Sequence, residues 1–378
     1  MKIKNTRGIN ERIMSYIEGR HHNSFIATAI LLPISSGGVV FADEKTVLHV
    51  ADQFWENAKR DGVEYTRDET IMAAMLLGLV RKHNVQGGQF PEALYDDITK
   101  NSRIFHKDSF AGDAYRKNIK YAEGSTLRYA LSEQSYQPYE LFLYNSPKTA
   151  GSGVQIPALA AFDCKWSYPC LKDGEKVIMS LTPYEIQTRQ DAIEKAKGRV
   201  LVLGLKMGYY TYMAHRKESV EKVTVIEEDA ALIEWFRQTI LPQFEHPEKV
   251  EVIQADPAAY MESCAEESFD LCFVDLWENH LDAEAYFRIR KVCKRFGMKK
   301  MEYWIEAHMI ETIMGLVFVA ILEAFYENAG ITAPSLAGLS DAGSGHLARI
   351  REALKNQEIT RPDHVDWFMD PENFMKLL

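Results

Sequence analysis

The hydrophobic positions of the first third of the chain repeat with the period of a helix. Lys45 to Arg60 and Glu69 to His83 each gather their apolar residues on one stripe, and Glu92 to Thr99 forms a third helical stretch. We expect further helices over 110–133. The pattern therefore predicts a helical amino-terminal domain over residues 1–138.

Residues that favour helix ends lie at the borders of these stretches. Gly62 suits the C-cap of the first helix, because glycine readily adopts a left-handed conformation there. Thr66 or Asp68 suits the N-cap of the second helix. Pro91 suits the first turn of the third.

Extended patterns replace the helical ones over residues 139–198. Glu140 to Tyr144 and Val154 to Phe162 are expected strands. Asp173-Gly174 predicts the turn of a β-hairpin that ends with Lys176 to Ser180. Thr182 and Pro183 then favour a helix start, and we expect that helix to reach Lys197, with Gly198 as its C-cap.

Short apolar runs alternate with helical stretches from residue 199 onward. This alternation predicts an α/β fold, in which helices flank a mostly parallel, Rossmann-like sheet. The expected strands are Val200 to Leu203, Lys222 to Ile226, Val250 to Ile253, Leu271 to Val274 and Lys299 to Ile305. We expect helices over 281–296, 307–328 and most of 347–378, with a loop over 330–346. Residues 199–378 thus form the third expected domain, after the hairpin and linking helix of 139–198.

Composition narrows the function classes. The 378 residues carry a formal charge of −10, so the chain lacks the basic surface that a nucleic-acid backbone requires. Five cysteines without a Cys-x-x-Cys pair are typical of reduced thiols in a cytoplasmic protein, and we expect no metal site.

Two apolar stretches need separate consideration. The segment 25–42 follows a basic leader as a signal peptide does, but Pro33 and a Ser-Ser-Gly-Gly run interrupt it, so we expect buried structure there. Met309 to Phe325 is also apolar, but Glu311 and Glu323 flank a core that we expect to be too short to span a bilayer.

The stretch from Arg199 to Ala214 carries the main candidate chemistry. An apolar run rich in β-branched residues, Val200 to Leu203, ends at Gly204, and Gly208 follows before helix-forming residues resume. A strand, a glycine loop and a helix in this order are typical of nucleotide-binding sheets, although an ordinary buried strand and turn has the same pattern. Acids also follow the next three strands, at Glu227, Asp256 and Asp275. Each acid is either a ligand contact at the carboxyl edge of the sheet or a helix cap.

These motifs, in this order, resemble those of class I S-adenosylmethionine-dependent methyltransferases, and more closely those of the spermidine synthase branch. The resemblance covers roughly residues 165–305 and includes the hairpin ahead of the glycine loop. It implies that Glu227 accepts hydrogen bonds from the ribose, that Asp256 contacts the adenine and that Asp275 is catalytic. The S-adenosylmethionine site that it implies consists of Gly204, Leu205, Gly208, Glu227, Glu228, Asp256 and Pro257.

Lys206 departs from the family pattern, which has a glycine at this point of the loop. We expect the lysine to carry its charge outward to water. Two alternatives stay open, in which it pairs with an acid such as Glu227 or Asp275, or binds an anionic group of the ligand.

The sequence thus predicts a transferase, in particular a methyltransferase, that uses S-adenosylmethionine on a small molecule in the cytoplasm. A non-catalytic binding or regulatory protein with a degenerate loop is the main alternative, and Lys206 is the residue that favours it. A nicotinamide-dependent oxidoreductase ranks third, because the loop lacks Gly-x-Gly-x-x-Gly. We expect neither nucleic-acid nor membrane partners, and the sequence leaves a homodimer open.

Overall fold

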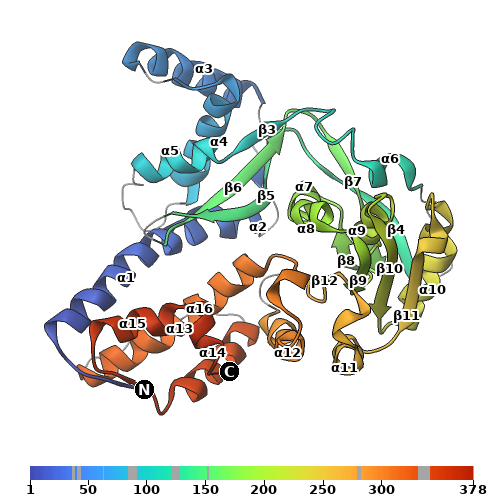
Figure 1. Cartoon of the computed structure of the whole chain (residues 1–378). Coiled ribbons are helices and arrows are strands. Elements are labelled where there is room, and N and C mark those ends of the chain that lie inside the picture. The colour runs from blue at the N-terminus through green and yellow to red at the C-terminus, as the bar shows by residue number, and fades with distance from the viewer. Residues whose placement is uncertain are drawn as a thin grey trace. The chain divides into compact units, whose positions relative to one another are not determined.

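A computed structural model of the chain (Figure 1) describes residues 1–35, 39–40, 44–62, 64–83, 92–120, 128–150, 153–278, 282–330 and 341–377. These residues form two compact units. The helical unit contains Met1–His22, Trp277–Lys291 and Ile305–Leu378, and the sheet unit contains Asn23–Leu276 and Val292–Trp304. Each unit draws on separate parts of the chain, so its bounds differ from those of the three consecutive domains expected from the sequence.

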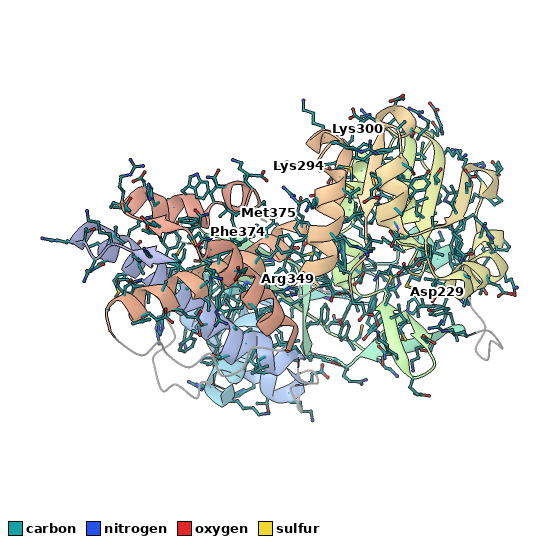
Figure 2. All side chains as sticks on the ribbon, turned by 90° about the horizontal axis from the view of Figure 1, so that it is seen from below. Asp229, Lys294, Lys300, Arg349, Phe374 and Met375 are labelled. Carbon is teal, nitrogen blue, oxygen red and sulfur yellow. The ribbon has the colours of Figure 1, made fainter. Side chains whose placement is uncertain are left out.

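The helical unit is built around α13 (Glu306–Asn328), whose apolar side chains, such as Met309, Ile313 and Val317, are buried. Phe374, which ends α16, is fully buried beside Met375 (Figure 2). The first strand pairs with the last in a parallel two-stranded sheet. The remaining elements are β1 (Lys2–Ile3), α1 (Arg7–Ile26, whose end belongs to the sheet unit), α12 (Ala283–Cys293), α14 (Asp341–Leu354), β14 (Glu358–Ile359), α15 (Pro362–Met369) and α16 (Pro371–Phe374).

Helix α13 confirms the helix expected over 307–328. It has 23 residues with a mean hydropathy of 1.8 over its most apolar window, so by length and composition it is able to cross a membrane, contrary to the sequence prediction. Half of that window is buried inside the protein. A single helix of this kind is weak evidence for a membrane span, since core helices of soluble proteins pass the same test.

The sheet unit begins with the helices predicted from the sequence. Thr66 caps α4, because its hydroxyl accepts the Glu69 N–H at 3.2 Å while the Glu69 carboxylate accepts the Thr66 N–H at 2.6 Å. Gly62 adopts the expected left-handed conformation after α3, and Pro91 lies outside the described residues. The predicted buried structure after Phe25 is confirmed for Ile26, Ala29 and Ile30. The elements are a π-helix (Ala27–Leu31), α2 (Leu32–Ser35), α3 (Glu44–Asp61), α4 (Arg67–His83) and α5 (Glu92–Lys100).

The prediction of helices over 110–133 is largely wrong. Only α6 (Ala114–Asn118) forms in the described part of that stretch, and β4 (Tyr129–Tyr136) is a strand. Its polar sequence carries little strand signal, but all eight residues pair antiparallel with β7. Strand pairing therefore decides the conformation here rather than local propensity.

The predicted strands and hairpin between residues 139 and 180 are confirmed. β5 pairs antiparallel with β6, and β7 with β8 across the Asp173-Gly174 turn. The two sheets have the orders β2-β5-β6-β3 and β4-β7-β8. Their strands are β2 (Val39–Val40), β3 (Arg103–Phe105), β5 (Glu140–Thr149), β6 (Gln155–Phe162), β7 (Trp166–Asp173) and β8 (Lys176–Ser180).

The helix expected from Thr182 to Lys197 is instead two short helices, α7 (Pro183–Gln187) and α8 (Gln190–Lys195). The start is as predicted, with Thr182 as N-cap. Gly198 is not a C-cap but the first residue of β9, with a φ of +60°. A Cβ atom there would overlap the Asp270 carboxylate, which accepts the Arg199 N–H at 2.8 Å.

A five-stranded sheet, parallel throughout, confirms the Rossmann-like prediction. Its order is β11-β10-β9-β12-β13, so the direction in which successive strands are added reverses between β9 and β12. Ligands of such sheets bind at this reversal, outside the carboxyl ends of the strands. The elements are β9 (Gly198–Leu203), α9 (Tyr209–His215), β10 (Val220–Glu227), α10 (Ala230–Trp235), β11 (Val250–Gln254), α11 (Pro257–Ser263), β12 (Leu271–Val274) and β13 (Met301–Tyr303).

Candidate functional site

The loop after β9 has the backbone shape of a glycine-rich loop. Gly204, Lys206 and Gly208 have φ values of +96°, +50° and +74°, in the left-handed region that favours glycine. A Cβ atom at Gly204 would overlap the Asp275 carbonyl oxygen, and one at Gly208 would overlap the Phe236 ring. Both glycines are therefore required for packing as well as for conformation, whereas the lysine adopts the same conformation at a steric cost.

Glu227 ends β10 and fixes this loop. One carboxylate oxygen accepts the Leu205 N–H at 2.9 Å, and the other accepts the N–H groups of Glu228 at 2.9 Å and Asp229 at 3.0 Å. A carboxylate has about four acceptor positions, so these bonds leave about one on the oxygen that faces the loop. Glu227 is half-buried, and Glu228 is exposed.

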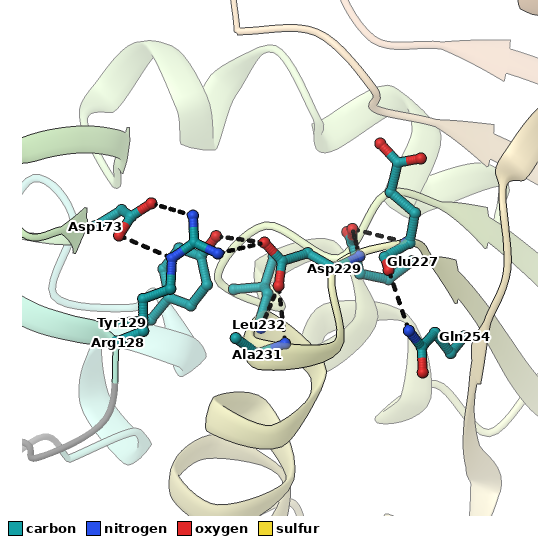
Figure 3. Close-up of polar contacts among 9 residues, drawn as sticks. Arg128, Tyr129, Asp173, Glu227, Asp229, Ala231, Leu232 and Gln254 are labelled. Carbon is teal, nitrogen blue, oxygen red and sulfur yellow. Dashed lines mark hydrogen bonds and ion pairs between the residues drawn. The ribbon is translucent and has the colours of Figure 1, made fainter.

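A network that the sequence reasoning missed lies beside Glu227 (Figure 3). Arg128 binds Asp173 with two hydrogen bonds, at 3.0 and 2.5 Å, and reaches Asp229 at 3.4 Å. The Tyr129 hydroxyl donates to the same Asp229 oxygen at 2.7 Å, and the other oxygen caps α10. These contacts attach the β4–β7 pair to the loop that follows Glu227.

Asp256 and Pro257 begin α11 as an N-cap and its first residue. The Asp256 side chain accepts the Ala259 N–H at 2.8 Å, so the helix-cap alternative applies to this acid. Pro257 is buried and Asp256 is half-buried at the carboxyl edge next to β11. The structure thus brings the expected cofactor residues to one edge of the sheet.

Asp275 follows β12 and lies in a buried ion pair that the sequence did not predict. Its Oδ2 atom accepts hydrogen bonds from Arg189 Nη2 at 2.6 Å and Nε at 3.2 Å. The other oxygen, Oδ1, is buried and has no hydrogen-bond partner among the described residues. Arg189 also donates to the Glu185 carboxylate and to the Glu185 carbonyl oxygen, the latter at 3.0 Å.

Aromatic contact and burial hold this cluster in place. The Arg189 guanidinium lies over the Trp304 ring at 4.2 Å, and the Trp304 indole donates to Thr188 Oγ1 at 2.9 Å. Burial alone would lower the pKa of Arg189, but the charges of Asp275 and Glu185 outweigh it and raise that pKa. Burial also raises the pKa of Glu185, although the charge of Arg189 opposes this.

Lys206 is half-buried, and its charge acts on Glu185 by lowering the pKa of that carboxyl group. The outward direction expected for its ammonium group, and the two alternatives to it, stay predictions. The charges of Arg189, Asp275 and Lys206 thus all act on Glu185, and Arg189 also bonds Asp275, at the carboxyl edge between β9 and β12. We call these four side chains the charge cluster.

All five cysteines are free thiols. Within the described residues, no three His, Cys, Asp or Glu side chains gather in a way that would hold a metal ion.

Comparison with known proteins finds matches among solved structures. No family model matches the sequence, and no curated protein matches it. Similar solved structures include spermidine synthase of Thermotoga maritima, with 20% identity and a TM-score of 0.27 over 34% of this chain and 45% of that chain. A putative O-methyltransferase of Klebsiella pneumoniae matches with 16% identity and a TM-score of 0.28 over 45% of this chain and 67% of that one. The SAH-bound methyltransferase PaMTH1 of Podospora anserina matches with 15% identity and a TM-score of 0.28 over 45% and 68%.

This chain thus spans less than half the length of the Thermotoga spermidine synthase. The matched proteins are of the two kinds that the sequence motifs resemble, a spermidine synthase and methyltransferases. The likeness concerns the fold, and the roles of individual residues depend on the geometry of this chain.

Proposed function

We propose that this protein is an S-adenosylmethionine-dependent transferase that acts on a small molecule, in particular a methyltransferase. The observation that supports this most strongly is the assembly of the loop after β9. Three left-handed residues shape this loop, and the carboxylate that ends β10 holds it at the reversal of strand order. Such a loop brings backbone atoms close to a ligand, which side chains would otherwise prevent.

The residues at this edge fit the cofactor. Glu227 has one acceptor position left on the oxygen that bonds Leu205, which suits a ribose hydroxyl donor. Asp256 lies beyond it, beside β11, and Gly204 and Gly208 keep the loop free of side chains at both ends. When bound, S-adenosylmethionine supplies an activated methyl group, so the chain's own task is to position the acceptor.

The test is calorimetric titration of the protein with S-adenosylmethionine, S-adenosylhomocysteine and NAD⁺. We expect the first two to bind and NAD⁺ not to bind. Glu227→Ala should weaken binding by about 1.5–3 kcal/mol, the range for a hydrogen bond to a charged group. Glu228→Ala is the matched control, because that neighbouring side chain is exposed, and it should leave the affinity unchanged. Equal affinities of the two variants, with both folded, would remove the ribose role of Glu227.

A non-catalytic binding or regulatory protein is the second candidate. Two observations favour it. The candidate catalytic acid, Asp275, is already paired with Arg189, and Lys206 occupies a loop position whose positive φ favours glycine. On this alternative, the wild-type protein binds neither S-adenosylmethionine nor S-adenosylhomocysteine in the same titration. Binding of both would exclude the degenerate-loop reading.

A further inference from the structure

The charge cluster contains two cations and two carboxylates, so its formal charge is zero. Arg189 is the centre, because it bonds both Asp275 and Glu185. Side-chain exposure is 1% for Arg189, 5% for Asp275 and 15% for Glu185, so water screens these charges little. A ligand that reaches this edge therefore meets carboxylates whose charges are already matched.

We propose that Arg189 is a specificity-determining residue which makes this edge a site for a neutral, hydroxyl-bearing small molecule and excludes a cationic amine. This inference rests on the proposed function only in taking the ligand as the acceptor of the transferred group. The charge argument itself depends on the described residues alone.

The exclusion of a cation follows from the cost of desolvating it. An ammonium group that leaves water for a buried site loses several kcal/mol of hydration, which only an unmatched carboxylate at close range offsets. Here Asp275 already accepts two hydrogen bonds from a guanidinium, and a second cation, Lys206, acts on Glu185. An incoming ammonium would thus meet as much repulsion as attraction.

The preference for a hydroxyl follows from the Oδ1 atom of Asp275. This oxygen is buried without a hydrogen-bond partner among the described residues, which is unfavourable for a carboxylate. A neutral O–H group satisfies it without adding charge. Asp275 directly follows β12, and its backbone carbonyl oxygen lies against Gly204, where the strand order reverses.

The test compares two probes of equal length, 1,5-pentanediol and 1,5-diaminopentane, which differ only in carrying hydroxyl or ammonium ends. Their dissociation constants are measured by ligand-observed NMR on the whole protein, with and without saturating S-adenosylhomocysteine. We expect the wild-type protein to bind the diol more tightly than the diamine. Arg189→Met should shift the ratio of the two affinities towards the diamine by at least about tenfold, because it uncovers two carboxylates.

Two further variants keep the test decisive. Lys206→Gly removes a cation from the half-buried loop and should shift the ratio the same way, by about threefold, even if Arg189→Met does not fold. Arg199→Met is the matched control, because Arg199 pairs with Asp270 at the opposite end of β9 with a side chain that is 47% exposed. It should leave the ratio unchanged.

A tighter wild-type affinity for the diamine, no binding of either probe, or equal shifts in the Lys206 and Arg199 variants would overturn the proposal. The proposed function fails separately, if S-adenosylmethionine and S-adenosylhomocysteine do not bind. If the protein still binds the diol more tightly than the diamine in that case, the proposed role of Arg189 stands and S-adenosylmethionine is rejected as the cofactor.

Discussion

The backbone of Lys206 stores strain that a single substitution should release. Its φ of +50° costs an L-residue about 1–2 kcal/mol, and glycine avoids this cost. Glycine also makes the unfolded chain more flexible, which offsets about 0.4–1 kcal/mol of the gain. We therefore expect Lys206→Gly to unfold with a free energy about 1 kcal/mol higher than that of Lys206→Ala.

The comparison between these two variants isolates the contribution of backbone strain to the free energy of unfolding, since both lack the ammonium group that acts on Glu185. The free energy of unfolding is measured by urea denaturation, with the wild-type protein and Lys206→Asn alongside. Asparagine tolerates the left-handed region better than alanine, so its variant should fall between the other two. Equal stability of the glycine and alanine variants would refute the assignment of strain to this position.

Two further predictions concern packing and pH. Gly208→Ala should destabilise the protein by about 2 kcal/mol or more, because the residue has a positive φ and its new Cβ atom would overlap a phenylalanine ring. Gly62→Ala is the control: it has a similar φ but open space around it, so it should cost only about 1 kcal/mol. Urea denaturation of both variants checks this, and equal losses would contradict the overlap. Burial raises the pKa of Glu185, so the folded protein holds that proton more tightly than the unfolded chain. The contribution of Glu185 to stability is present below pH 4.5 and is lost as the pH rises through the raised pKa. The melting temperature of Glu185→Gln should therefore depend less on pH above pH 4.5 than that of the wild-type protein. The same pH dependence in both proteins would contradict this prediction.

The sequence predicts the parallel sheet well, because buried parallel strands are short, continuous apolar runs. Val200 to Leu203 and Leu271 to Val274 lie fully inside β9 and β12. The two glycines of the loop that follows β9 have a left-handed backbone. The same reasoning fails for β4, whose Ser-Glu-Gln-Ser centre is polar and has no apolar run. Its strand conformation comes from pairing with β7, which local sequence does not encode.

The partners of the acids at the strand ends are the second part that sequence does not reveal. Arg189 lies 86 residues before Asp275, and Arg128 lies 101 residues before Asp229. Nothing in the local pattern links these pairs, because an arginine in a helix or ahead of a strand is usually solvated. The contacts appear only when the fold brings the segments together.

These partners decide how a ligand is able to bind. Three of the acids expected at the strand ends already accept hydrogen bonds from the chain: Glu227 from the loop, Asp256 from α11 and Asp275 from Arg189. At Glu227 a ligand hydroxyl adds a bond without displacing one, so ribose recognition requires no rearrangement. At Asp275 the guanidinium occupies only Oδ2, and Oδ1 has no hydrogen-bond partner among the described residues, so a ligand hydroxyl adds a bond there without breaking the buried ion pair. The geometry therefore favours Asp275 as an acceptor that orients a neutral hydroxyl, and the rate of any transfer would then depend on positioning.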